Sequence, residues 1–169
     1  MFLTRIFLVG FMGAGKSTVG KSLAMKLTWP FIDLDKEIEK SFGDPIHQIF
    51  KSKGEPFFRQ LETEALKGVD RFPNCVVALG GGTFIEEKNR SLIKQLGFSI
   101  FLNLPLETVL QRCPIDDNRP LLQDRSSIKN LYFKRLPIYC ETDLEIDASL
   151  SPDEIVDNIL LKGYFRLVN

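Results

Sequence analysis

The 169-residue chain has a single histidine, His47, and only three cysteines, Cys75, Cys113 and Cys140. The cysteines are odd in number, far apart and in no metal-ligand spacing, which predicts reduced thiols and argues against a disulfide framework or a zinc site. The chain also has no excess of either charge, because 22 Lys and Arg residues balance 22 Asp and Glu residues. This balance argues against a protein dedicated to binding nucleic acid or a membrane surface.

Long apolar runs are missing as well. No stretch approaches the ~20 residues that a membrane-spanning helix needs. The apolar start, residues 1–9, lacks a basic leader and a small-residue cleavage site and leads directly into a glycine-rich motif, so it predicts a first strand instead of a signal peptide. We therefore expect a cytoplasmic protein. A hydrophobic content of 44% over this length predicts one domain with a substantial core.

Short apolar stretches alternate with longer helical ones along the chain. Strands are predicted at residues 3–9, 31–33, 75–79, 98–104 and 144–147, and helices at 16–27, 46–50, 57–66, 86–96, 106–112, 128–139 and from 152 onward. Ser151 and Pro152 are typical of a helix start, as cap and first helical residue. The stretch 128–139 is predicted to be a helix despite Pro137, a residue type that can end or bend a helix. Strands that alternate with helices predict a parallel sheet covered on both faces.

One motif indicates a nucleotide site. Residues 10–18, Gly-Phe-Met-Gly-Ala-Gly-Lys-Ser-Thr, fit G-x-x-x-x-G-K-[ST] between a predicted strand and a predicted helix. Its glycines let the backbone curl around a phosphate, and N–H groups converge on the anion at the positive end of the helix. Lys16 would reach the β- and γ-phosphates, and the Ser17 hydroxyl could bind Mg²⁺. The candidate phosphate-binding residues are Gly13, Ala14, Gly15, Lys16, Ser17 and Thr18.

Two carboxylates follow the second predicted strand, in Asp33-Leu34-Asp35. Ligands of open parallel sheets bind at the carboxyl ends of strands, and residues two apart on a strand face the same way, so both acids could serve one site. One could hold water on Mg²⁺, and the other could accept a proton from an attacking hydroxyl. Without the motif before it, this pair could equally be solvated acids at a helix start.

Glycines and arginines provide further candidates. The triplet Gly80, Gly81 and Gly82 follows a predicted strand and suits a place where backbone approaches a ligand closely, although a flexible turn is the alternative. Four arginines, Arg59, Arg112, Arg119 and Arg135, stand near other polar motifs. Each alone is more often a solvated surface charge, yet guanidinium groups are the preferred partners of carboxylate and phosphate.

In order and over nearly the whole chain, these motifs resemble the shikimate kinase family. Residues 10–20 are close to its P-loop, and Asp33-Leu34-Asp35 matches its D-x-D. The further matches are Gly54-Glu55 with Phe58-Arg59 and Glu62 (G-E-x-x-F-R-x-x-E), the glycine triplet, Arg119-Pro120-Leu121-Leu122 (R-P-L-L) and Arg135 to Tyr139 (R-x-x-x-Y).

The resemblance implies an enzyme that transfers the γ-phosphate of ATP to the 3-hydroxyl of shikimate, with Mg²⁺, on the way to chorismate and the aromatic amino acids. It implies that Lys16 and Ser17 bind phosphate and Mg²⁺, and that Asp33 supports the metal through water. Asp35 would contact shikimate hydroxyls as the candidate base. ATP and shikimate would be the only partners, and we expect a monomer.

The resemblance also assigns the arginines and the fold. Arg59 and Arg135 would clamp the shikimate carboxylate, the glycine triplet would line the substrate, Arg112 would stack on adenine, and Arg119 would close over the phosphates as a third catalytic residue beside Lys16 and Asp35. Ile46, Phe50 and Phe58 resemble a pocket wall, or else are core. The implied fold is a P-loop kinase, a five-stranded parallel sheet flanked by helices like the nucleoside monophosphate kinases. A single domain, residues 1–169, would carry a substrate-binding segment at about 33–66 and a mobile lid at about 114–124.

The sequence departs from the family pattern in two places. The stretch after Tyr139 lacks the usual alanine-acid pair, and residues 113–118 form an unusual approach to the lid. Two other classes remain open at this point. One is another small-molecule kinase of the same fold, such as a gluconate or nucleotide kinase, and the other is a non-catalytic nucleotide-binding protein.

Overall fold

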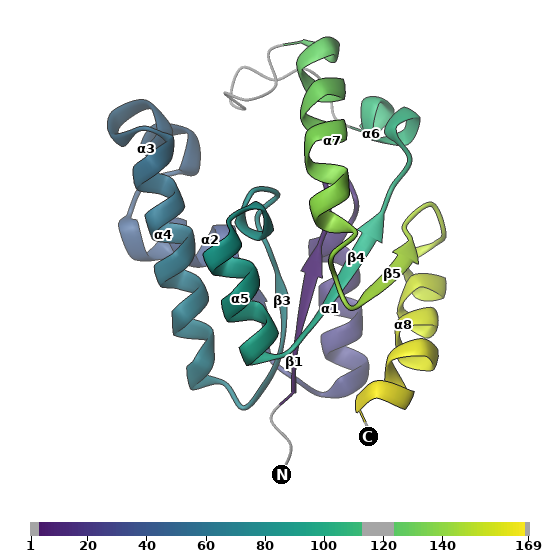
Figure 1. The fold of residues 1–169 in the computed structure, drawn as a ribbon. Coiled ribbons are helices and arrows are strands. Elements are labelled where there is room, and N and C mark those ends of the chain that lie inside the picture. Colours follow the sequence, from purple (N-terminus) through teal and green to yellow (C-terminus); the bar gives the residue numbers. More distant parts are fainter. Residues whose placement is uncertain (1–3, 113–123, 168–169) are drawn as a thin grey trace.

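The strands form one parallel sheet. The computed structural model describes residues 4–112 and 124–167, with side chains up to residue 163. Its sheet has the order β2-β3-β1-β4-β5, and every neighbouring pair is parallel, as the sequence predicts (Figure 1). The strands are β1 (Thr4–Val9), β2 (Phe31–Asp33), β3 (Asn74–Ala78), β4 (Phe98–Asn103) and β5 (Leu144–Asp147).

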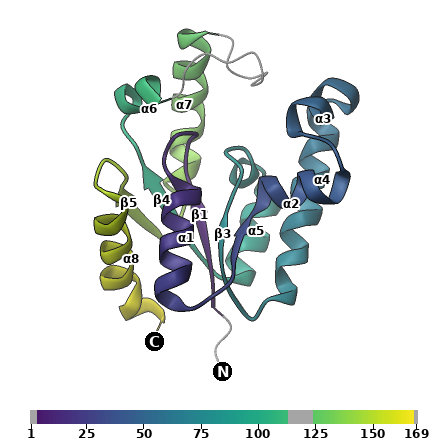
Figure 2. The same cartoon turned by 180° about the vertical axis from the view of Figure 1, so that it is seen from behind.

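Helices cover both faces of this sheet. Figure 1 shows α5 and α7 on the near face, and Figure 2 shows α1 and α8 on the opposite face. The helices are α1 (Lys16–Leu27), α2 (Leu34–Phe42), α3 (Ile46–Lys53), α4 (Glu55–Lys67), α5 (Glu87–Leu96), α6 (Leu106–Arg112), α7 (Arg125–Tyr139) and α8 (Pro152–Leu167), with the 3-10 turns η1 (Gly68–Arg71) and η2 (Thr83–Ile85). The three-layer arrangement places the carboxyl ends of all strands at one edge.

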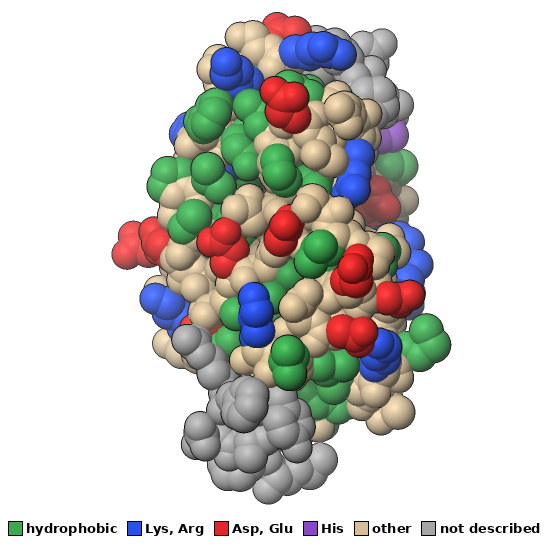
Figure 3. Space-filling view, turned by 90° about the vertical axis from the view of Figure 1, so that its right-hand side faces the viewer, with side chains coloured by type: hydrophobic (Ala, Val, Ile, Leu, Met, Phe, Trp, Pro, Cys, Tyr) green, Lys and Arg blue, Asp and Glu red, His purple; other side chains and the backbone are tan. Residues whose placement is uncertain are grey.

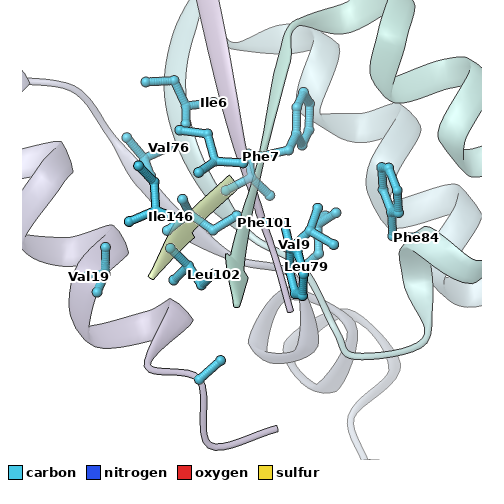
Figure 4. Packing of buried hydrophobic residues seen from close by; sticks show 14 of the residues in the cluster. Ile6, Phe7, Val9, Val19, Val76, Leu79, Phe84, Phe101, Leu102 and Ile146 are labelled. Carbon is cyan, nitrogen blue, oxygen red and sulfur yellow. The ribbon is translucent and has the colours of Figure 1, made fainter. Parts of the chain in front are cut away.

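The core fills the space on both sides of the sheet. Phe7, Val76 and Phe101 from the three central strands are almost fully buried. Figure 4 shows that Val19 of α1 packs on one side of them and that Phe84 of η2 lies on the other. Central strands that are buried on both faces are expected to be continuously apolar, which is how these strands read in the sequence.

The structure corrects two local predictions. Helix α2 was not predicted, and it makes Asp35 a residue of the first helical turn, so the strand alternation argued for Asp33 and Asp35 does not apply. Helix α7 starts at Arg125 because the Asp124 side chain caps it, accepting from the Ser127 N–H at 2.7 Å. The predicted end of this helix at Tyr139, beyond Pro137, is confirmed.

The predicted helix start at Ser151 is confirmed. The Ser151 hydroxyl and backbone N–H both donate to the Glu154 carboxylate, at 2.6 Å and 3.0 Å, and the Glu154 N–H points back to the Ser151 hydroxyl at 3.4 Å. This reciprocal pairing is a capping box.

Helices α2, α3 and α4 form a unit beyond the β2 edge of the sheet (Figures 1 and 2). They have a small core of their own, in which Ile38, Ile49 and Phe58 are buried. The unit coincides with the predicted substrate-binding segment, residues 33–66, and extends it by one residue, to Lys67. Its separate core lets the three helices pack as a body beside the sheet.

The surface carries both charges. Figure 3 shows the side of the molecule that carries α8 and β5, where acidic, basic and hydrophobic side chains are interspersed. In the part of the chain that the structure describes, no helix combines the length and apolar character needed to cross a membrane.

Arg5 joins three segments at the end of the sheet opposite to the strands' carboxyl ends. Its side chain is 4% exposed and donates to the Phe72 carbonyl at 2.7 Å, the Leu96 carbonyl at 3.2 Å and the Asp70 carbonyl at 2.8 Å. It also pairs with the exposed Asp70 carboxylate at 3.0 Å. A buried guanidinium is tolerated because each of these bonds compensates for lost hydration.

We predict that Arg5→Met lowers the free energy of unfolding by roughly 2–4 kcal/mol, because three partly buried carbonyls lose the nearly buried donor that they share. Urea denaturation measures the change. Arg71→Met is the control, since Arg71 is 65% exposed and its contact with Glu37 is 3.4 Å long, and it should change stability by less than about 0.5 kcal/mol. Equal effects of the two substitutions would show that the hydrogen bonds of Arg5 to the three carbonyls do not stabilise the fold.

Candidate active site

A cleft of about 630 Å³ opens at the carboxyl ends of the strands. It is lined by the loop before α1, the ends of β2 and β3, and residues of α2, α3, α4 and α7. Twelve of the sequence-predicted site residues line it together: Gly13, Gly15, Lys16, Ser17, Thr18, Asp33, Asp35, Arg59, Gly80, Gly81, Gly82 and Arg135. The three apolar candidates Ile46, Phe50 and Phe58 line it as well, and Phe58 also belongs to the small core.

A second cavity of about 320 Å³ lies between α2 and α4. Its lining is mostly apolar, with Glu37, Glu64 and Arg71 among its polar residues. None of the sequence-predicted site residues lines it, so the larger cleft is the candidate active site.

The loop between β1 and α1 has the geometry of a phosphate cradle. Gly13 and Gly15 have φ angles of 76° and 85°, a backbone region that side chains other than glycine rarely adopt. Gly15 directly precedes the first turn of α1, so the first N–H groups of the helix face the cleft. The Lys16 ammonium donates back to the Gly10 and Phe11 carbonyls, at 2.8 Å and 3.0 Å, and lies across the loop.

Ser17 and Asp33 are joined across the cleft. The Ser17 hydroxyl donates to the Asp33 carboxylate at 2.7 Å, which links the first turn of α1 to the end of β2. A hydroxyl and a carboxylate in contact fit Mg²⁺, which takes few protein ligands and keeps several waters. Within the described residues, no three His, Cys, Asp or Glu side chains are grouped around one point as a metal site.

Asp35 is the carboxylate with the most perturbed acidity in the cleft. Burial raises its pKa from the ordinary 3.8 to about 6, the negative charge of Glu62 adds to the rise, and Lys16 opposes it. A carboxylate of this pKa is ionised at neutral pH and is a stronger base than an ordinary aspartate. Such a group next to a phosphate cradle is suited to take a proton from a hydroxyl.

Arg59 is held by two carboxylates from its own helix. Its Nη1 donates to Glu62 at 2.6 Å, and its Nε and Nη2 donate to Glu55 at 3.2 Å and 2.7 Å. The Glu62 side chain is 1% exposed, whereas that of Glu55 is 47% exposed. The buried pair with Glu62 therefore fixes the guanidinium, and the exposed pair adds little because water competes for it.

The glycine triplet leaves room for functional side chains. A Cβ on Gly82 would lie 2.2 Å from Arg59 Nη1, and a Cβ on Gly80 would lie 2.5 Å from Asp35 Oδ1 and 3.0 Å from Glu62 Oε1. The sequence predicted a close approach of the backbone to a ligand. In the structure, a side chain at either glycine would displace charged groups of α2 and α4 that lie against them.

Arg135 enters the cleft from α7, almost buried, with its guanidinium 5.9 Å from the centre of the Phe11 ring. One turn later, Tyr139 donates its hydroxyl to the Gly81 carbonyl. Burial raises the pKa of Tyr139 to about 12, so it stays neutral and serves as a donor. The R-x-x-x-Y spacing thus puts both side chains on the face of α7 that meets the glycine triplet.

Two of the predicted residues that the structure describes, Ala14 and Arg112, do not line the cleft. Ala14 is 1% exposed and packs in the core. Arg112, at the end of α6, donates to the Gly13 carbonyl at 3.3 Å and so lies beside the phosphate loop. Arg119 lies outside the described residues, as does the predicted lid except for Asp124.

Sequence reasoning missed several residues of the cleft. Glu62 was recognised only as part of a motif, and its effect on Asp35 and Arg59 was not foreseen. Lys36, Glu39 and His47 also line the cleft, and the lone histidine had been set aside. A helical wheel for α4 would have placed Arg59 and Glu62 on one face, three residues apart.

The arrangement suits one kind of chemistry. One cleft holds a phosphate cradle with a lysine, a basic carboxylate and two nearly buried arginines. These groups can hold a nucleoside triphosphate, deprotonate a hydroxyl and bind an anion that is separate from the phosphates. That set describes phosphoryl transfer to a small acid that carries a hydroxyl.

Comparisons with known proteins agree with this geometry. The family model for shikimate kinase matches residues 12–162. A shikimate kinase of Persephonella marina is 48% identical over 160 residues, 94% of this chain and 98% of the relative.

Two solved structures are also similar over nearly their whole length. Shikimate kinase from Aquifex aeolicus has a TM-score of 0.89 at 40% identity, covering 97% of this chain and 98% of that one. The enzyme from Acinetobacter baumannii in complex with shikimate has a TM-score of 0.91 at 37% identity, covering 99% and 96%. Together with the cleft, these matches show that the chain belongs to the shikimate kinase family.

Proposed function

We propose that this chain transfers the γ-phosphoryl group of ATP to the 3-hydroxyl of shikimate, giving shikimate 3-phosphate and ADP. The observation that carries the proposal is a single cleft in which a P-loop lysine, Asp35 and two arginines meet. Family membership supports the same reaction. It also supports a place in aromatic amino-acid synthesis, as the family name implies.

The nucleotide end of the cleft is proposed to be the loop of residues 10–18. Its N–H groups and Lys16 would bind the β- and γ-phosphates, and the Lys16 ammonium would exchange its two loop carbonyls for phosphate oxygens. The Ser17 hydroxyl and, through water, Asp33 would hold Mg²⁺. When bound, the metal would neutralise charge on the phosphate oxygens. Arg112 lies beside this loop and is proposed to contact the adenine.

Arg59 and Arg135 are proposed to bind the shikimate carboxylate. Arg59 and Arg135 reach the glycine triplet from α4 and α7, on opposite sides of the β3 end. A planar guanidinium can give two parallel hydrogen bonds to a carboxylate. Ile46, Phe50 and Phe58 would supply the apolar wall against the carbon ring, in the segment of residues 33–66.

Asp35 is proposed to accept the proton of the 3-hydroxyl. Its raised pKa makes it a better base, and the reacting hydroxyl would lie between it and the γ-phosphate. The proton would pass to the carboxylate as the new oxygen–phosphorus bond forms and the bond to ADP breaks. The role of Arg119, and the expectation of a cytoplasmic monomer, remain predictions.

A coupled assay of ADP release tests the function. Purified protein with ATP should turn over shikimate and should leave gluconate and nucleosides unphosphorylated. Lys16→Ala should remove this turnover without unfolding the protein, because Lys16 bonds loop carbonyls at the surface of the cleft. Equal rates with gluconate would favour the other small-molecule kinases, and absent turnover of every acceptor would favour a nucleotide-binding protein.

We predict that Asp35→Asn lowers kcat by ~10²–10⁴-fold, the usual cost of losing a general base. The amide keeps the shape of the side chain and cannot take the proton. Steady-state kinetics with saturating ATP and shikimate measure the loss. A kcat within about twofold of the wild type would show that Asp35 is not the base.

We further predict that Asp35→Asn stabilises the folded protein at pH 8. The folded-state pKa of Asp35, about 6, exceeds the ordinary 3.8, so the ionised carboxylate destabilises the fold above pH 6. This destabilisation disappears as the pH falls from 6 to 4, because the folded protein then binds the proton. Its size is on the order of 2 kcal/mol. Urea denaturation at pH 8 and pH 4 should show a gain at pH 8 alone. A gain of the same size at both values would mean that charge is not the cause.

We predict that Gly82→Ala raises the KM for shikimate roughly 10- to 100-fold and leaves the KM for ATP unchanged. The new methyl group would sit 2.2 Å from Arg59 Nη1 and push the guanidinium aside, which weakens a nearly buried charge contact. Gly68→Ala is the control, because open space surrounds a Cβ there and its φ is −63°. A rise in the KM for ATP would assign Arg59 to the nucleotide.

A further inference from the structure

A buried chain of hydrogen bonds reaches the cleft from behind. It starts at Asn89 of α5, which is fully buried and donates its amide to the Thr83 carbonyl at 2.9 Å. The Thr83 hydroxyl donates to Glu62 Oε1 at 2.6 Å, and Glu62 Oε2 accepts from Arg59 at 2.6 Å. These hydrogen bonds connect helices α4 and α5, which lie side by side in both ribbon views (Figures 1 and 2).

A second branch closes this network on α4. The Thr63 hydroxyl donates to Asn89 Oδ1 at 2.9 Å and lies 3.0 Å from the Arg59 carbonyl. Asn89 therefore holds both the backbone of Thr83 and the helix that carries Arg59. Every buried side-chain nitrogen and oxygen of the described residues has a hydrogen-bond partner, so the network is complete and stiff.

Thr83 is the member of the network that lies directly behind Glu62, outside the cleft. Its side chain is fully buried, and it is not among the residues that line the cleft. Its hydroxyl is nevertheless one of the two donors to the Glu62 carboxylate, which is itself 1% exposed. A buried carboxylate needs donors on both oxygens, because it has lost its hydration.

We propose that Thr83 is a positioning residue for the acid substrate: by holding Glu62, it fixes the guanidinium of Arg59 against Gly82 in the orientation that receives the carboxylate. The inference rests on the proposed function, because Arg59 is taken as the residue that binds shikimate. It adds a residue that sequence motifs did not point to. Thr83 acts only through Glu62 and is not a catalytic residue.

We expect the loss of the Thr83 hydroxyl to weaken the binding of the acid substrate and not the binding of ATP. Without the Thr83 hydroxyl, Glu62 Oε1 has no donor and lies beside a second carboxylate, Asp35. Glu62 is then free to turn away, and Arg59 loses its one buried partner among the described residues. We expect the remote carboxylate of the substrate to bind less well, while the phosphate loop, residues 10–18, keeps its geometry.

The test compares four variants by steady-state kinetics: three substitutions of Thr83 and the control Ser99→Ala. Thr83→Val, which keeps the shape, and Thr83→Ala, which removes the hydroxyl without adding bulk, should each raise the KM for shikimate about 3- to 30-fold. The KM for ATP should not change, and kcat should stay within about twofold. Thr83→Ser keeps the hydroxyl and should restore the wild-type KM.

Ser99→Ala is the matched control. The Ser99 hydroxyl is also buried and donates to a carboxylate, that of Asp143, at 2.7 Å, but it lies between β4 and β5, away from the cleft. Ser99→Ala and Thr83→Val should both lower the melting temperature. Only the Thr83 variants should raise the KM for shikimate, because stability alone does not orient Arg59.

A readout without substrate separates this inference from the proposed function. The Nε–H resonance of Arg59, seen by ¹H–¹⁵N NMR, should shift or broaden in Thr83→Val and stay in place in Ser99→Ala. If wild-type protein does not phosphorylate shikimate, the proposed function fails. If it does, and the Thr83 variants lose stability with an unchanged KM and an unchanged Arg59 resonance, Thr83 is only a structural residue and the inference is overturned.

Discussion

The pair between Arg59 and Glu62 is the contact on which the cleft depends. Glu62 is almost completely buried, so its charge must be compensated by Arg59 and by the Thr83 hydroxyl, at 2.6 Å each. The same negative charge adds to the effect of burial on Asp35 and raises its pKa to about 6. One buried carboxylate thus orients an arginine and strengthens a base, which is how neighbouring ionisable groups acquire different roles.

Space for this pair comes from the backbone. Gly80 and Gly82 lack the Cβ atoms that would collide with Asp35 and with Arg59. The strand before them, β3, lies between β2 and β1 in the sheet, so the triplet is next to both Asp33 and the phosphate loop. The parallel topology therefore brings four segments that are distant in sequence to one edge, where a ligand can contact all of them.

Much of the fold followed from local pattern. The five strands were predicted to within one residue of their bounds, because buried parallel strands are short apolar runs with clear ends. Helix α2 was missed, since Leu34–Phe42 mixes charged and apolar residues and follows β2 without a break. Helix α7 continues past Pro137 to Tyr139, as predicted, and Tyr139 at its end is buried and bonds to Gly81.

The sequence by itself determined the phosphate loop and the identity of the arginines, because these depend on residue type and spacing along a short segment. Only the tertiary structure decided which carboxylate carries the raised pKa and which residues hold Arg59. Burial and the approach of Glu62 to Asp35 arise when α2, α4 and the end of β3 pack together. Distances of this kind join residues as far apart as Asp35 and Thr83, and no local pattern encodes them.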